Sequence, residues 1–122
     1  MSDHEEQMTA MVAERLTSTY GALVAACALL PIPIALPTGV VSNLEMVPAL
    51  RRIETLAEEQ PMPELQQSEL YTAAMLWLAA ADVFSLLVEE YVEARAAGAL
   101  GILLTVREAI HELGTWLLTQ ED

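Results

Sequence analysis

The residues best suited to chemistry in this chain are a glutamate and a histidine three positions apart, Glu108 and His111. On a helix these positions lie on the same side, and di-iron carboxylate bundles hold their metals with this Glu-x-x-His spacing. A complete site needs a second such pair and two further glutamates. The other histidine, His4, has no glutamate at the matching position, although a homodimer could supply the missing half. Because Ile110 and Leu113 are expected to be buried, His111 should face solvent. We therefore predict a polar helix surface, with no metal site and no other cofactor.

One helical turn also separates Arg107 from His111. This pair is superficially similar to the Arg–His ribonuclease motif on the last helices of HEPN domains, which are also small helical bundles. The resemblance implies an RNA-processing enzyme in which both side chains act in catalysis. The spacer here is shorter than that of the family, and Glu108 stands where the motif has asparagine, so the sequence assigns no family. A helical-bundle metal or RNA-processing enzyme using Glu108 and His111 is kept as an alternative.

Two further polar groups stand in apolar surroundings. Asp82 lies between Ala81 and Val83, and a carboxylate buried there would need a polar partner or a proton. We expect a structural polar contact, with a water-facing helix edge as the alternative. Cys27 is the single cysteine and has no nearby base that would lower the pKa of its thiol. It is predicted to be a small core residue. No catalytic residue is predicted, and the chain is interpreted as a non-enzyme.

An all-α fold must position these residues. The stretch from Leu70 to Val92 carries one charge, Asp82, before Glu89, and repeats its apolar residues at three- and four-residue steps. A helix that is apolar around most of its girth lies in the middle of a protein or in a membrane. We interpret it as the central helix of a small bundle of about four helices. The whole chain, 1-122, is expected to be a single all-α domain.

Apolar periodicity and breaker residues predict the helix bounds. The predicted helices cover residues 5–30, 43–59, 63–96 and 99–119. Three prolines within residues 31–41 exclude a helix there and predict a proline-rich extended connection between the first two helices.

Three local features affect these bounds. Ser42 and Glu45 have the form of a capping box. Pro48 conflicts with that cap, so we expect either a separate first turn or a regular helix that starts at Pro48. Gly98 and Gly101 predict the break between the third and fourth helices, against the alternative of one continuous helix.

The charge of the chain limits its partners. Eighteen acidic residues face five basic ones, and the net charge is −13. This charge disfavours direct binding to nucleic acid or anionic lipid and favours a protein partner with a basic surface. We expect a small acidic protein–protein interaction module, an inhibitor or neutraliser of the phage anti-defence or immunity type, which covers a nucleic-acid-binding site of its partner. Its acidic surface is predicted to comprise Glu54, Glu58, Glu59, Glu89, Glu90 and Glu93.

Hydrophobic residues make up 54% of the chain. The uncharged span of residues 16–44 is long enough to cross a bilayer, but prolines interrupt it. The acidic N-terminus does not have the form of a secretory signal. We predict a cytoplasmic protein and keep a structural or membrane-associated subunit as an alternative. The apolar excess predicts a homodimer, with interface candidates Leu23, Leu30, Ile32, Ile34, Leu36, Trp77 and Phe84.

Overall fold

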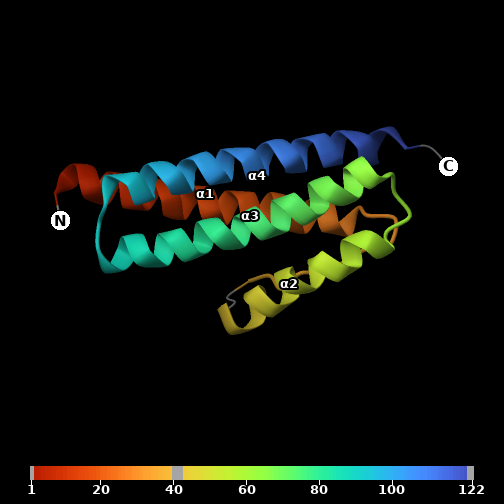
Figure 1. Cartoon of the computed structure of the whole chain (residues 1–122), viewed down its shortest axis with the longest axis horizontal. Coiled ribbons are helices and arrows are strands. Elements are labelled where there is room, and N and C mark those ends of the chain that lie inside the picture. The colour runs from red at the N-terminus through yellow and green to blue at the C-terminus, as the bar shows by residue number, and fades with distance from the viewer. Residues whose placement is uncertain (1, 40–42, 121–122) are drawn as a thin grey trace.

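The computed structural model describes residues 2–39 and 43–120, and within them it contains four α-helices and no strand. The helices are α1 (Asp3–Ala28), α2 (Asn43–Glu59), α3 (Glu64–Glu89) and α4 (Glu93–Thr119). Figure 1 shows α1, α3 and α4 side by side along the long axis, with α2 lying along one part of α3. The prediction of a small all-α bundle is confirmed.

Helix α3 is the centre of the bundle. It packs against α4, α2 and α1, while α1 packs also against α4. Two faces of α3 are buried because its apolar residues recur around most of its girth. Leu70, Ala74 and Trp77 lie on one of these faces, and Ala80 and Leu87 lie on the other. The prediction of a central helix is confirmed.

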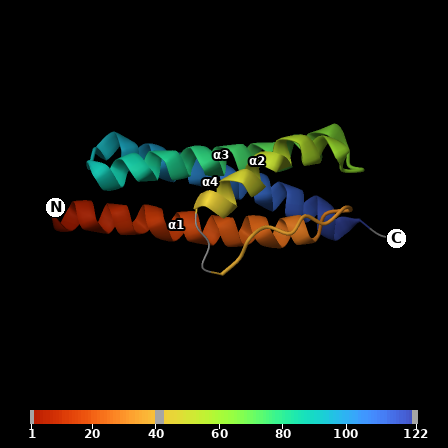
Figure 2. The ribbon, with the colours of Figure 1, turned by 90° about the horizontal axis from the view of Figure 1, so that it is seen from below.

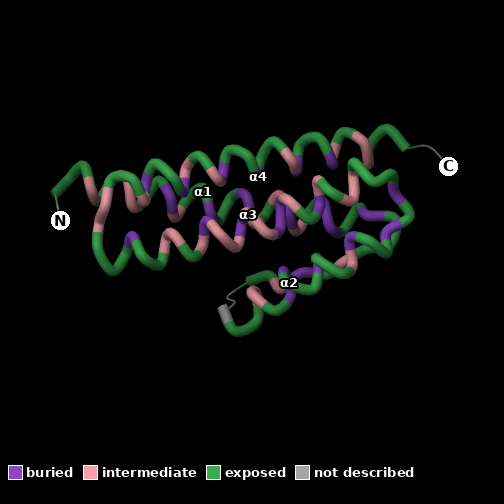
Figure 3. Tube along the Cα trace, viewed as in Figure 1, coloured by how far each residue is buried: buried purple, intermediate pink, exposed green. Residues whose placement is uncertain are grey.

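The core follows the three- and four-residue periodicity of the helices (Figure 3). Small side chains occupy several of its positions, and Ala73 and Ala80 of α3 and Ala96 and Ala99 of α4 are fully buried. Helices α3 and α4 have the most extensive contact in the bundle, because alanine allows two helix backbones to approach closely. The largest fully buried side chains are Leu23, Leu50, Ile53, Leu70, Leu87 and Leu113.

The break between α3 and α4 lies earlier than predicted. Glu90 and Val92 have extended backbone geometry, so α3 ends at Glu89 and not near residue 96. The guanidinium of Arg95 donates to the carbonyl oxygens of Glu90 (2.9 Å) and Leu86 (3.3 Å), which satisfies acceptors that a helix end leaves free.

Gly98 and Gly101, the predicted breakers, lie inside α4. A glycine in a helix costs about 1 kcal/mol relative to alanine. The burial of Ala96, Ala99 and Leu103 on the same helix outweighs that cost. The placement of the break at the glycines was therefore wrong.

The other bounds shift by a few residues. Helix α1 begins at Asp3, capped by Ser2, whose hydroxyl accepts from the backbone N–H of Glu5 at 3.2 Å. Pro63 precedes α3 as its N-cap and is not its first residue. Pro48 lies inside α2, so neither predicted alternative for it is right. Its missing N–H removes a single backbone bond near the helix start. The predicted cap Ser42 lies outside the described residues.

The segment between α1 and α2 contains no helix over residues 30–39. The buried side chain of Gln60 forms two hydrogen bonds with the backbone of Ile32 in this segment. The Ile32 N–H donates to Oε1 of Gln60 at 3.0 Å, and Nε2 of Gln60 donates to the Ile32 carbonyl at 2.8 Å. The hydroxyl of Tyr20 donates to the Pro37 carbonyl at 2.6 Å. These bonds hold the segment against the bundle; its polyproline-like geometry stays a prediction.

Candidate functional site

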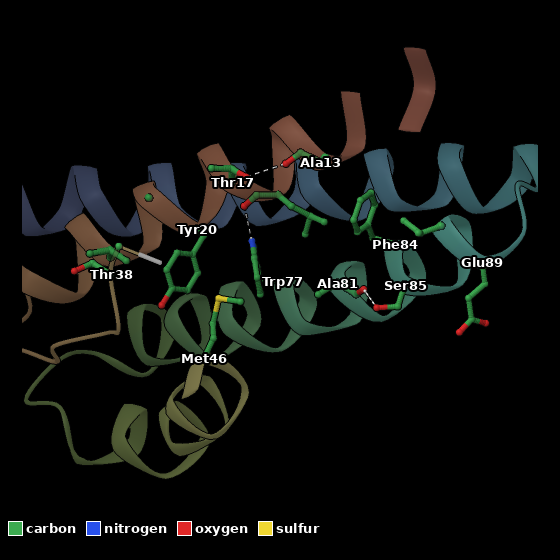
Figure 4. Close-up of a pocket in the computed structure, with 15 residues that line it drawn as sticks. Ala13, Thr17, Tyr20, Thr38, Met46, Trp77, Ala81, Phe84, Ser85 and Glu89 are labelled. Carbon is green, nitrogen blue, oxygen red and sulfur yellow. Dashed lines mark hydrogen bonds between the residues drawn. The ribbon is translucent and has the colours of Figure 1, made fainter. Parts of the chain in front are cut away.

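A groove of about 900 Å³ runs between α1 and α3. Figure 4 shows side chains of both helices lining it, with Met46 of α2 near one end and Glu89 near the other. Thr38 of the connecting segment also lies at the Met46 end. The groove therefore begins beside the first turn of α2 and continues toward the junction of α3 and α4.

Two aromatic rings form the fixed part of the groove floor. The indole N–H of Trp77 donates to the Leu16 carbonyl at 3.0 Å, and Trp77 is 4% exposed. The ring of Tyr20 lies 5.2 Å from that of Trp77 at an angle of 51°, a favourable arrangement for an aromatic pair. Because the hydroxyl of Tyr20 is also bonded to Pro37, both rings are held in place before anything binds.

The groove exists because α2 is shorter than its neighbours. Helix α2 has 17 residues, whereas α1 and α3 have 26 each. After a short turn at residues 60–63 the chain reverses direction, so α2 lies along the first half of α3 (Figures 1 and 2). Beyond Met46 the apolar face of α3 continues without that cover. Ala81 and Phe84 there are half-buried, and Val88 is 58% exposed.

Polar residues line the groove from both helices, and one of them, Glu89 of α3, is acidic. Thr17 and Gly21 line it from α1, and Glu14 precedes them at the same helical spacing. Ser85 and Glu89 line it from α3. Asp82 shares their stripe at the same three- and four-residue steps. All three acids are exposed, and none of the described arginines or histidines lines the groove.

The six glutamates of the predicted acidic surface do not lie together. Glu54, Glu58 and Glu59 are exposed on α2, whereas Glu89, Glu90 and Glu93 surround the junction of α3 and α4 at the opposite end of the bundle (Figure 1). The 26 residues of α3 span about 39 Å at 1.5 Å per residue. The six residues therefore form two separate groups and do not make one contiguous surface.

Glu93 already has partners within the chain. Its carboxylate lies 3.2 Å from Nε2 of His4, and it accepts a 2.6 Å hydrogen bond from the Tyr91 hydroxyl. The hydrogen bonds from Tyr91 and His4 lower the pKa of Glu93, while the bond to Glu93 raises the pKa of Tyr91 to about 12. These contacts join the start of α1 to the start of α4, so Glu93 has a structural role.

The predicted dimer-interface residues divide into two groups. Leu23, Leu30, Leu36 and Trp77 are at most 7% exposed within one chain, so they present almost no surface to a second copy. The remaining three are Ile32, which is 53% exposed, and the half-buried Ile34 and Phe84.

The residues singled out for chemistry are mostly on the surface. Glu108 and His111 are exposed on α4, as is Arg107, and no three potential metal ligands gather within residues 2–39 and 43–120. Asp82 is exposed, so the expectation of a buried polar contact was wrong and its helix-edge alternative is right.

Cys27 is fully buried, and burial raises the pKa of its thiol to about 12. Its prediction as a core residue is confirmed.

Sequence reasoning missed the groove itself. It assigned Trp77 and Phe84 to an apolar face, but it did not identify Ala13, Thr17 or Ser85 as residues of a site. A usable signal was present in the helix lengths, since the predicted second helix is much shorter than the first and third. A short helix packed on a long one leaves part of the longer apolar face uncovered.

Comparison of this chain with protein-family models, curated proteins and solved structures found no match.

Proposed function

We propose that this protein is a small non-enzymatic interaction module that binds another protein through the groove between α1 and α3. It acts as an inhibitor or neutraliser of a partner that has a basic surface. The observation that supports this proposal is an open apolar floor with the carboxylate of Glu89 at its edge and the exposed acids Glu14 and Asp82 one helical turn from lining residues. The same combination is typical of protein-binding surfaces, in which apolar anchors are surrounded by charged rims.

The chemistry of the groove favours binding over catalysis. Its lining is mainly alanine, leucine, valine and aromatic side chains. The groups that could accept or donate a proton in a reaction are Thr17, Tyr20, Thr38, Ser85 and Glu89. Among the described residues, no histidine or cysteine lines the groove to activate these hydroxyls as nucleophiles. The fixed pair of Tyr20 and Trp77 instead provides a preformed apolar surface, which reduces the entropy cost of association.

The charge of the whole chain supports a basic partner. A net charge of −13 attracts a cationic surface from a distance and raises the association rate at low salt. It repels nucleic acid and anionic lipid for the same reason. A nucleic-acid-binding protein would therefore meet this chain through the positive site it uses for phosphates, and an occupied groove would place acidic residues over that site.

Photo-cross-linking in the native host cells tests this proposal. Benzoylphenylalanine in place of Ser85 stands on the groove edge, while the same residue in place of the exposed Thr105 on α4 is the matched control. We expect Ser85 to yield one adduct with a second protein and Thr105 to yield none. The adduct should also disappear when Ala81→Trp fills the groove. Absence of any adduct at Ser85, or equal labelling at both positions, would refute the proposal.

A second candidate function, that of a membrane-associated subunit, rests on α3. This helix is long and apolar enough to cross a bilayer, although here it packs against three other helices. Fractionation without detergent separates the two. Recovery in the soluble fraction at both low and high salt supports the interaction module, and recovery in washed membranes supports the subunit.

A further inference from the structure

We propose that the segment held in this groove is a single amphipathic helix of the partner, with lysine or arginine along both of its polar edges. This inference rests on the proposed protein-binding function and adds the chemistry of the bound element. It follows from the shape of the groove, the spacing of its apolar residues and the sign of its edges.

The shape of the groove matches a helix. The α3 wall runs from Trp77 to Glu89, which is about 18 Å at 1.5 Å per residue. Helix α2 already packs along the preceding part of α3, and its first turn, with Met46, lies beside the groove. A second helix placed there would continue the layer that α2 begins. The length corresponds to about three to four helical turns.

The floor has space for large apolar side chains. Ala13 on α1 and Ala81 on α3 are small and line the groove together with the larger Phe84. Because alanine fills less space than phenylalanine, the floor is lower at these two positions than at Phe84. Helices that bind in grooves place apolar anchors at positions i, i+3 or i+4, and i+7. Those spacings allow leucine-sized anchors to sit at the low positions.

The edges determine which charge the helix carries. Glu89 lines the groove from α3. Glu14 on α1 and Asp82 on α3 lie three residues before the lining residues Thr17 and Ser85, so helical spacing places them next to the groove. Glu6 lies seven residues before Ala13, two turns along the same face of α1. All four are exposed and acidic. Basic residues that flank an apolar stripe would meet these carboxylates on both sides, which gives specificity and fast association.

The same charges disfavour a second copy of this chain. Two grooves facing each other would bring Glu14, Asp82 and Glu89 of both copies together, within a dimer of net charge −26, twice the −13 of one chain. Like charges across an interface are unfavourable. The homodimer predicted from the apolar excess is therefore an alternative occupant, and the experiment must detect it.

The test uses three fluorescent peptides of about fourteen residues, each matched in length to the groove. The first has a leucine stripe with lysines on both edges. The second has the same composition in scrambled order, which keeps the charge and removes the stripe. The third keeps the stripe and replaces lysine by glutamate. Fluorescence anisotropy with the full chain is expected to show binding of the first peptide at least roughly tenfold tighter than of the other two.

Variants of the protein locate the binding site. Ala81→Trp fills a low position of the floor, and we expect it to weaken binding of the basic peptide roughly tenfold or more. Glu89→Gln removes one edge charge and should weaken binding roughly twofold to fivefold, with a smaller dependence on salt. Glu54→Gln makes the same change on α2, away from the groove, and should leave the affinity unchanged. Circular dichroism and thermal unfolding confirm that each variant is folded.

The outcomes separate this inference from the proposed function. Equal binding of the basic and acidic peptides, or equal effects of the glutamine variants at positions 89 and 54, overturns the basic-helix inference. A light-scattering mass near twice 13.3 kDa that falls to 13.3 kDa in Ala81→Trp identifies a second copy as the occupant and also overturns it. A protein adduct at Ser85 in cells, together with failure of all three peptides, overturns this inference alone.

Discussion

The two halves of α3 share the apolar three- and four-residue periodicity but have different surroundings. The first half is covered by α2. The second half continues the apolar pattern through Ala81, Phe84 and Val88, but no helix among the described residues covers it on that side. In both halves α4 packs on the opposite face (Figure 1).

Under the proposed function, one helix would serve both stability and binding. Apolar residues beneath α2 are removed from water when the chain folds. Apolar residues in the open half stay partly exposed, so the proposed partner would remove them from water on binding. Polar positions follow the same division, since Gln60 is buried and bonded whereas Ser85 and Glu89 remain on the surface. Substitutions in the covered half should therefore change the free energy of unfolding, and those in the open half should change binding.

The largest expected effect comes from the helix that provides the cover. Leu50 on α2 is fully buried, so Leu50→Ala should lower the free energy of unfolding by about 2–5 kcal/mol through lost burial and a cavity. Phe84→Ala in the open half should cost less, about 1–2 kcal/mol, because the ring is already partly exposed. Urea unfolding monitored by circular dichroism measures both. Equal losses would mean that the two halves contribute alike to stability.

The next effect concerns the attachment of the connecting segment. Gln60→Ala leaves the N–H and the carbonyl of Ile32 without the partner that now bonds both. We expect a loss of about 1–3 kcal/mol in the free energy of unfolding, because unpaired buried polar groups are costly. Gln7→Ala, at an exposed position of α1, is the control and should change little. If Gln60→Ala unfolds at the same urea concentration as the native protein, the segment does not depend on this contact.

A smaller effect of opposite sign is expected in α4, beside the open half. A Cβ added at Gly98 or at Gly101 would meet no atom within 4 Å. Each change to alanine should raise the free energy of unfolding by about 0.5–1 kcal/mol, because alanine loses less conformational entropy in a helix. Thermal unfolding of the double variant measures the sum. If Gly98 instead ended a helix with positive φ, alanine there would be strained and would destabilise the protein. A lower melting temperature would therefore support a helix break at Gly98.

The smallest effect depends on pH and lies in the covered half. One carboxylate oxygen of Glu69 is buried without a hydrogen-bond partner among the described residues. Burial and the nearby Glu112 raise the pKa of Glu69. An acid whose folded pKa is raised binds its proton more tightly in the native state, so its ionisation destabilises the fold as pH rises through that window.

Glu69→Gln should therefore stabilise the protein at pH 7, and the gain should vanish below the ordinary pKa of 4.5. Melting temperatures of the native protein and the variant between pH 3 and pH 8 measure the difference. Glu64→Gln, at an exposed position in the first turn of α3, serves as the control for charge removal. If the gain from Glu69→Gln does not change with pH, it does not come from the ionisation of Glu69.

Local rules were sufficient for most of the secondary structure. The prolines at positions 31, 33 and 37 end the first helix wherever it packs, because proline removes a backbone donor and restricts the preceding residue. The predicted bounds of α2 agree with those observed, from Asn43 to Glu59. The glycines of α4 misled the prediction, because their conformational cost is small compared with the burial of their neighbours.

The sequence by itself determined the helical class, the number of helices, the burial of Cys27 and the central position of α3. These depend on periodicity and on residue type, which act over a few turns of chain. The tertiary structure alone decided that Asp82 faces water, that the six predicted glutamates occupy opposite ends, and that a groove opens beyond Met46. Those features depend on how far one helix runs along another. That distance follows from packing between residues remote in sequence, and periodicity within a single helix carries no information about it.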